Sequence, residues 1–197
     1  MSPGRFRWLL IAIVLSGCYL PSDFTADLRI TPDGNYNFQY TGQLTYLPLR
    51  EKLAQGGLSQ TEVAEQVKAV TDDLARDKGF EEISYVDSAT FRVRYKRVGN
   101  ILREKSYTFI RINSRLLSME RRADGTVDIY GDKPNTADAQ RIATSGLVMR
   151  GQFRIQTEAK VMQQNATETV EGAAPVYVWR IDGVEKPSPR LILSTRP

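Results

Sequence analysis

Apolar and polar residues alternate along much of this chain, which is the pattern of β-strands with one buried face. The first alternating segment covers residues 24–31, and the second covers residues 36–46. Between them lies the sequence Pro-Asp-Gly-Asn at residues 32–35, a strong turn signal. These segments are therefore predicted to form a long antiparallel hairpin.

One segment, residues 59–78, has the spacing of an amphipathic helix. Ser59 and Glu62 fit a capping box at its start, and Gly79 is placed to end it. Its apolar side chains share one face at helical spacing: Val63, Val67, Val70 and Leu74. We expect this helix to lie on a β-sheet.

Alternating segments continue through the rest of the chain, joined mostly by short turns. They cover residues 91–96, 106–112, 117–119, 127–129, 153–161, 176–181 and 191–194. A short helix is expected at residues 136–145, and the polar residues 163–174 are expected to form a loop. The pattern predicts one α+β domain over residues 24–197, with a curved, mostly antiparallel sheet of about eight or nine strands packed on one main helix.

The beginning of the chain has the order of a secretory signal. Two arginines, Arg5 and Arg7, precede an uninterrupted apolar run at residues 8–15. That run is well short of the ~20 residues of a membrane-spanning helix. The sequence Leu-Ser-Gly-Cys at residues 15–18 resembles the bacterial lipobox, in which the cysteine thiol receives diacylglycerol and the peptide is cut just before it.

The lipobox divides the chain. Residues 1–17 are predicted to be a lipoprotein signal peptide, Cys18 the lipidated N-terminus, and residues 18–23 a short tether. The acyl groups would attach the protein to a membrane of the bacterial cell envelope. In a bacterium with two membranes, Tyr19 in place of an aspartate favours the outer membrane, with the domain facing the periplasm. The alternative is an ordinary signal or anchor in which the cysteine is incidental.

Two gaps in composition exclude several kinds of chemistry. The chain has no histidine, which excludes a Ser-His-Asp triad, a Cys-His pair and a histidine zinc site. It has one cysteine, which excludes an intramolecular disulfide. The carboxylate pairs at residues 72–73 and 81–82 are adjacent in sequence and do not face each other. We therefore expect no catalytic residue, no metal site and no cofactor.

Positive charge gathers in the middle of the chain. Removing Arg5 and Arg7 with the signal leaves 25 basic and 23 acidic residues, whereas residues 92–122 alone hold ten basic and two acidic ones. Four basic residues are predicted to contact the membrane or anionic headgroups, at roughly 1 kcal/mol for each well-placed cation; they are Arg92, Arg94, Lys96 and Arg97. The alternative is that they form the solvated face of a strand.

Aromatic residues on the predicted strands form a second candidate set. They are Tyr36, Phe38, Tyr40, Tyr46, Phe91, Tyr95, Tyr107, Phe109, Tyr177 and Trp179. A curved sheet packed against one helix can enclose an apolar cavity, which suits a lipid-like ligand. The alternative is that these side chains fill the core.

Several short motifs follow one another in a known order. The lipobox cysteine is followed closely by an apolar strand and a Pro-Asp-Gly turn, and later by Ala-Lys-Val at residues 159–161, Asn165, and Val-Tyr-Val-Trp-Arg-Ile at residues 176–181. This order resembles the LppM-type lipoprotein domain of bacteria. The resemblance implies an α+β domain at a membrane that binds envelope lipids or glycolipids, but it supplies no residue-level motif for binding.

The chain departs from that family at its C-terminus. LppM-type proteins commonly end in a transmembrane helix, whereas this sequence stops at Pro197 after Leu-Ile-Leu-Ser at residues 191–194. Attachment is therefore expected to depend on Cys18 alone.

Two functions follow as expectations. The first is a non-enzymatic, lipid-anchored envelope protein that binds a lipid or glycolipid in an aromatic-lined cavity. The alternative is an accessory interaction module that docks to an envelope protein complex through an exposed strand edge. Nucleic acid is not an expected partner of an exported protein.

Overall fold

A computed structural model describes residues 19–111, 114–132 and 136–195. The strands are β1 (Tyr19–Ile30), β2 (Asn35–Tyr46), β3 (Phe80–Asp87), β4 (Thr90–Asn100), β5 (Ser106–Arg111), β6 (Ser114–Arg121), β7 (Thr126–Tyr130), β8 (Arg150–Thr157), β9 (Lys160–Gln164), β10 (Glu168–Val170), β11 (Val176–Asp182) and β12 (Arg190–Ser194). The helices are α1 (Leu47–Gln55), α2 (Gln60–Ala75), α3 (Ile101–Glu104) and α4 (Thr136–Thr144). None of these helices is long and apolar enough to cross a membrane.

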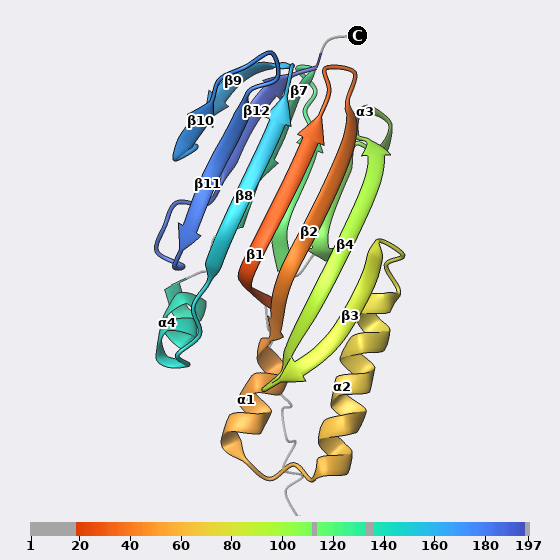
Figure 1. Ribbon diagram of the computed structural model, residues 1–197, viewed down its shortest axis with the longest axis vertical. Helices are drawn as coiled ribbons and strands as arrows, with labels where there is room; N and C mark the ends of the chain where they lie inside the picture. The colour runs from red at the N-terminus through yellow and green to blue at the C-terminus, as the bar shows by residue number, and fades with distance from the viewer. Residues whose placement is uncertain (1–18, 112–113, 133–135, 196–197) are drawn as a thin grey trace, which may run out of the picture.

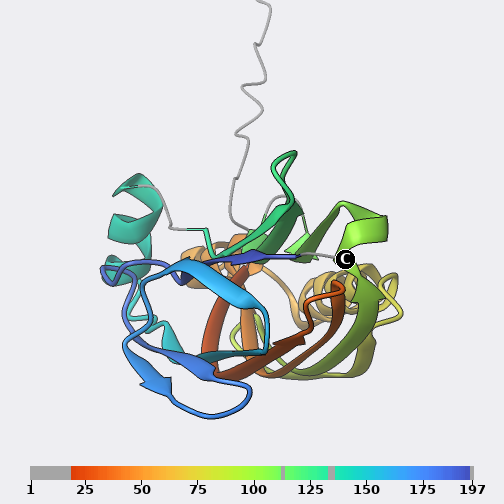
Figure 2. The same ribbon diagram turned by 90° about the horizontal axis from the view of Figure 1, so that it is seen from above.

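The strands form two sheets that face each other (Figures 1 and 2). The first has seven strands in the order β10-β11-β8-β1-β2-β4-β3, and the second has five in the order β5-β6-β7-β12-β9. Neighbouring strands are antiparallel except for β1 and β8, which are parallel. The predicted α+β class is confirmed, but the single sheet of eight or nine strands is replaced by two sheets.

The predicted hairpin is present as β1 and β2. The two strands pair from Tyr19 opposite Tyr46 to Ile30 opposite Tyr36. The turn between them needs a glycine, because Gly34 has a φ of 80° and a Cβ there would lie 2.6 Å from Leu102 Cγ. The hairpin follows from alternation and turn chemistry together.

The hairpin begins earlier than the sequence predicted. Tyr19 and Leu20 are only 8% and 3% exposed, and Leu20 packs against Ile142 and Val184. Residues 19–23 therefore belong to β1, and the prediction of a tether there is wrong. The alternation was hidden by a bulge, because the register shifts between residues 22 and 25 and Asp23 adopts a φ of 45°. Cys18 and the predicted signal peptide lie outside the described residues.

The predicted main helix is α2, and its capping box is confirmed. Glu62 N–H donates to Ser59 Oγ, and Ser59 N–H donates to the Glu62 carboxylate. Only Val70 and Leu74 of its apolar face are fully buried, because α2 covers the edge strand β3 instead of the middle of the first sheet (Figure 1). The second sheet takes the place that the sequence prediction gave to this helix.

Aromatic side chains from both sheets fill much of the space between them. The ring centroid of Phe109 in β5 lies 5.1 Å from Phe38, 5.0 Å from Tyr40 and 4.7 Å from Tyr95. Such tilted and edge-to-face contacts stabilise a core beyond simple burial. These four aromatic candidates form the packed centre of the sandwich.

Candidate functional site

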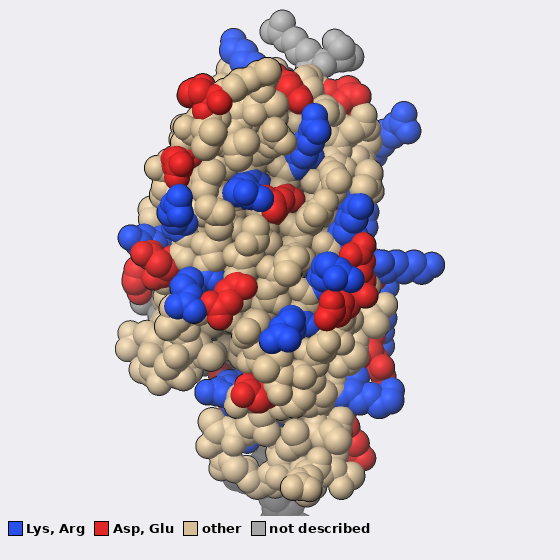
Figure 3. Space-filling view, viewed as in Figure 1, with Lys and Arg blue, Asp and Glu red and all other residues tan. Residues whose placement is uncertain are grey.

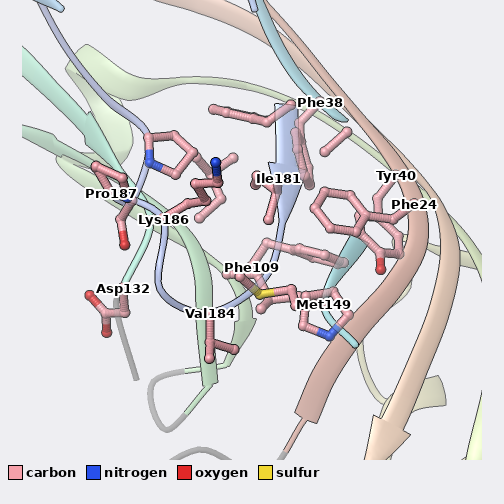
Figure 4. Close-up of a pocket in the computed structure, with 18 residues that line it drawn as sticks. Phe24, Phe38, Tyr40, Phe109, Asp132, Met149, Ile181, Val184, Lys186 and Pro187 are labelled. Carbon is pink, nitrogen blue, oxygen red and sulfur yellow. The ribbon is translucent and has the colours of Figure 1, made fainter. Parts of the chain in front are cut away.

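An apolar pocket remains between the sheets, and Pro21 and Phe24, near the start of β1, are among the residues that line it (Figure 4). Its walls come from strands distant in sequence. The aromatic side chains that line it are Phe24, Phe38, Tyr40, Phe109 and Phe153. Tyr40 presents only its ring, because its hydroxyl donates to the Gln43 carbonyl at 3.0 Å and burial raises the pKa of its phenol. The walls are therefore apolar in character.

The mouth of the pocket is polar. Its exposed lining residues are Asp132, after β7, and Lys186 and Pro187, in the connection from β11 to β12. Lys186 Nζ lies 3.5 Å from Asp182 Oδ1, and both side chains are more than half exposed. A surface ion pair of this kind contributes little to stability, so the ammonium group can turn to another anion at small cost.

The pocket is narrow. It holds about 60 Å³ of free volume, whereas pockets that enclose drug-sized ligands have about 300–1,000 Å³. This space suits the end of one apolar chain. Met149 lines the pocket and is only partly buried. Because a methionine side chain changes its conformation easily, Met149 is the lining residue best able to move aside for a longer acyl chain.

Two glycines shape the wall at Phe24. A Cβ on Gly42 would lie 2.5 Å from Phe24 Cβ, and a Cβ on Gly151 would lie 2.4 Å from Phe24 Cδ1. The two glycines flank β1 on β2 and β8, which gives the phenylalanine ring the room to stack on Tyr40 at 5.6 Å. The position of this wall therefore depends on backbone on both sides of β1.

The aromatic residues selected from the sequence divide between pocket and core. Phe38, Tyr40 and Phe109 line the pocket, whereas Tyr95 and Tyr107 are joined by a hydrogen bond of 3.1 Å between buried hydroxyls. Several residues that line the pocket were not predicted from the sequence; among them are Pro21, Phe24, Ala26, Met149, Phe153 and Lys186. Phe24, Ala26 and Phe153 did lie on predicted strands, but nothing in the sequence placed them opposite β5.

Three of the four predicted headgroup contacts share one surface. Arg92, Arg94 and Lys96 are exposed on the outer face of β4. Arg94 pairs with Glu81 at 3.0 Å and Glu82 at 3.4 Å. Figure 3 shows this outer face, where lysines and arginines are interspersed with acidic residues. The sheet therefore presents mixed charge there instead of a continuous cationic surface.

Arg97, the fourth predicted contact, is directed toward the space between the sheets. It donates from Nε to Tyr36 Oη at 3.0 Å and from its terminal nitrogen to Glu104 at 3.2 Å, and its guanidinium lies 5.0 Å from the centroid of the Tyr107 ring. Burial raises the pKa of Tyr36 to about 12, so its hydroxyl stays neutral. Arg97 thus holds the end of the core together, and the structure separates it from its three neighbours.

Replacing Arg97 by glutamine is expected to lower the free energy of unfolding by about 1–2 kcal/mol, because two hydrogen bonds and a cation–π contact are lost. The matched control is Lys96→Gln, one residue away on the opposite face, which is expected to change it by less than about 0.5 kcal/mol. Urea denaturation of both variants measures the difference. Equal effects would show that Arg97 is an ordinary surface residue.

The comparisons with known proteins include a distant structural neighbour. No family model matches this chain, and no curated protein matches it. The chain is similar to the NMR structure of the folded domain of the Mycobacterium tuberculosis LppM protein, with a TM-score of 0.47 and 12% sequence identity. The match covers 92% of this chain and 94% of that chain. This is a weak LppM-like resemblance, and it transfers no residue role.

Proposed function

We propose that this protein is a non-enzymatic, lipid-anchored envelope protein whose pocket binds an acyl chain of a lipid or glycolipid with an anionic headgroup. The observation that carries this proposal is the pairing of an apolar, aromatic-walled pocket with a lysine at its exposed mouth. Each methylene group that leaves water for such a pocket contributes about 0.8 kcal/mol. The lysine gives the anionic group a partner outside the apolar space.

The anchor is the second part of the proposal. Cys18 lies outside the described residues, and its acylation is proposed from the lipobox sequence at residues 15–18. Acyl chains on Cys18 would hold the domain at the membrane of the cell envelope, which is also the source of its ligand. A permanently anchored protein needs only a weak affinity for that ligand, because the lipid is always nearby.

The alternative function, docking of an envelope protein along a strand edge, has less support. Among the described strands, the edge strands β10, β9 and β5 span three, five and six residues. The longer edge strand β3 carries Glu81 and Glu82 and lies against α2. Short, charged or covered edges resist pairing with a further strand.

Charge reversal at the pocket mouth tests the proposed headgroup contact. Lys186→Glu is expected to weaken binding of a single-chain phospholipid with an anionic headgroup by about fivefold, equivalent to about 1 kcal/mol. Binding of the zwitterionic analogue should change little. Lys78→Glu, an exposed lysine between α2 and β3, is the matched control and should leave both affinities unchanged. Equal losses in the two variants would reject a specific role for Lys186.

A further inference from the structure

We propose that the lower end of the domain rests directly on the lipid bilayer and that two uncharged loops form the contact. The first consists of the α1–α2 loop with the adjoining ends of both helices, residues 53–61, and the second consists of the last residues of α4 with the loop to β8, residues 142–149. This inference rests on the proposed acylation of Cys18. It adds the orientation of the domain and the surface that touches the lipid.

The folded domain begins directly after the proposed anchor, at Tyr19. Tyr19 is 8% exposed, pairs with Tyr46 across the hairpin and packs its ring against the Tyr46 ring at 5.1 Å. Leu20 is fixed in a cluster with Ile142 and Val184. Because consecutive Cα atoms are about 3.8 Å apart, an acylated Cys18 would lie within one residue of the folded surface. The end of the domain at which β1 begins would then lie close to the membrane surface.

The two segments that flank the start of β1 contain no charged residue. Residues 53–61 read Leu-Ala-Gln-Gly-Gly-Leu-Ser-Gln-Thr and residues 142–149 read Ile-Ala-Thr-Ser-Gly-Leu-Val-Met, without a charged side chain in either. Figure 1 places α1 and α4 at the lower end of the first sheet. On the face seen in Figure 3, the lobe at the lower left is without charged groups, and the lowest lobe has acidic groups only at its right margin. Val148 is 56% exposed, although it is apolar. Uncharged loops on both sides of an acyl anchor suit the boundary between headgroups and acyl chains.

The apolar pocket lies at the same end of the domain. Pro21 lines the pocket three residues after Cys18, and Met149 belongs both to the pocket wall and to the second loop. Val184 joins the pocket to the cluster around Leu20. A lipid chain that leaves the bilayer at this end would reach the pocket with little exposure to water.

This orientation also places the four predicted headgroup contacts at different distances from the membrane. Lys96 pairs with Gln39, and Gln39 pairs with Asp27, eight residues beyond Tyr19 along β1. At about 3.3 Å per residue this is about 26 Å from the start of the strand, well beyond the screening length of about 8 Å in physiological salt. Arg92 lies level with Ser22, at about 10 Å. Arg92 is therefore the one of the four that lies nearest to the start of β1, at about the screening length, and the other three lie well beyond it.

Site-directed labelling of the acylated, full-length protein in vesicles tests this orientation. Acylation consumes the thiol of the only cysteine, so an introduced cysteine is the single site for a fluorescent label. Val148→Cys probes the second loop. The matched control is Val170→Cys in β10, which is 50% exposed and lies toward the other end of the first sheet (Figure 1). Vesicles of phosphatidylcholine and phosphatidylglycerol contain brominated acyl chains as the quencher.

The label at residue 148 is expected to be quenched at least threefold more than the label at residue 170, and Leu58→Cys in the first loop should behave like Val148→Cys. Equal quenching at both ends, in protein that floats with the vesicles and carries acyl groups by intact mass, would overturn this orientation and leave the anchor standing. Protein without acyl groups that does not float would overturn both the anchor and the orientation. Thermal unfolding of each labelled variant checks that its fold is kept.

Discussion

Replacing Phe109 by alanine lowers the free energy of unfolding by about 3–5 kcal/mol. The side chain is 1% exposed and projects from β5 of the second sheet into rings of the first sheet. Its removal takes away contacts with Phe38, Tyr40 and Tyr95 and leaves a cavity that continues into the pocket. Since small domains are stable by about 5–15 kcal/mol, this change removes a large part of the total.

Urea denaturation followed by circular dichroism measures the loss at Phe109. The control is Tyr85→Ala on the edge strand β3, where the ring is 40% exposed and contacts only the Phe91 ring among the described aromatic residues. That variant is expected to lose less than about 1.5 kcal/mol. A loss at Phe109 no larger than at Tyr85 would contradict a packed aromatic core shared by the two sheets.

Replacing Cys18 by alanine is expected to abolish acylation completely. In the proposed anchor the Cys18 thiol is the group that is alkylated, and the sequence holds no other cysteine to replace it. Without acyl chains the protein should remain as unprocessed precursor or be recovered in the soluble fraction, because the proposed attachment depends on those chains. Incorporation of labelled fatty acid, together with cell fractionation, measures both effects.

The control for this experiment keeps the cysteine and changes its neighbour. Ser16→Ala leaves a small residue before the cleavage site and should be acylated and membrane-bound like the original protein. Labelled fatty acid recovered in the Cys18→Ala variant would contradict the proposed anchor, since the acyl group would then be attached elsewhere.

Local sequence patterns predicted the elements in which one signal dominates. The β1–β2 hairpin follows from alternation on both sides of the turn at residues 32–35, and α2 follows from its capping box and its apolar face. Four elements were missed: α1, α3, β3, and β10, which lies within the loop expected at residues 163–174. The single strand expected at residues 153–161 is divided between β8 and β9, which belong to different sheets. Two of the missed elements have weak signals. The strand β3 is exposed on nearly every residue, so it lacks alternation, and α1 has no side-chain cap at its start.

The division into two sheets could not be read from alternation. Alternation shows that a strand has one buried face, but not which face of another sheet covers it. The pairings are also distant in sequence, because β8 joins β1 in the first sheet and β12 lies between β7 and β9 in the second. Helix α2 was therefore assigned to a face that the second sheet covers.

The candidate site was predictable only in its chemistry. Aromatic strand residues indicated an apolar interior, but the pocket depends on the room that Gly42 and Gly151 leave for Phe24 and on a lysine in a loop. The inward direction of Arg97 did have a signal in the sequence. Arg97 is two residues from the buried Tyr95 and therefore points to the same face of β4, whereas Lys96 points to the opposite face.

Native mass spectrometry of the full-length protein, extracted from its own membranes, tests the central claim most directly. The informative variant is Ala26→Leu, because Ala26 is 5% exposed on the pocket wall and the added carbon atoms would occupy the free space of about 60 Å³. The proposed function predicts one non-covalent lipid in addition to the covalent acyl groups, and its loss in Ala26→Leu at unchanged thermal stability. A protein without bound lipid, or equal lipid in both forms, would contradict lipid binding in this pocket.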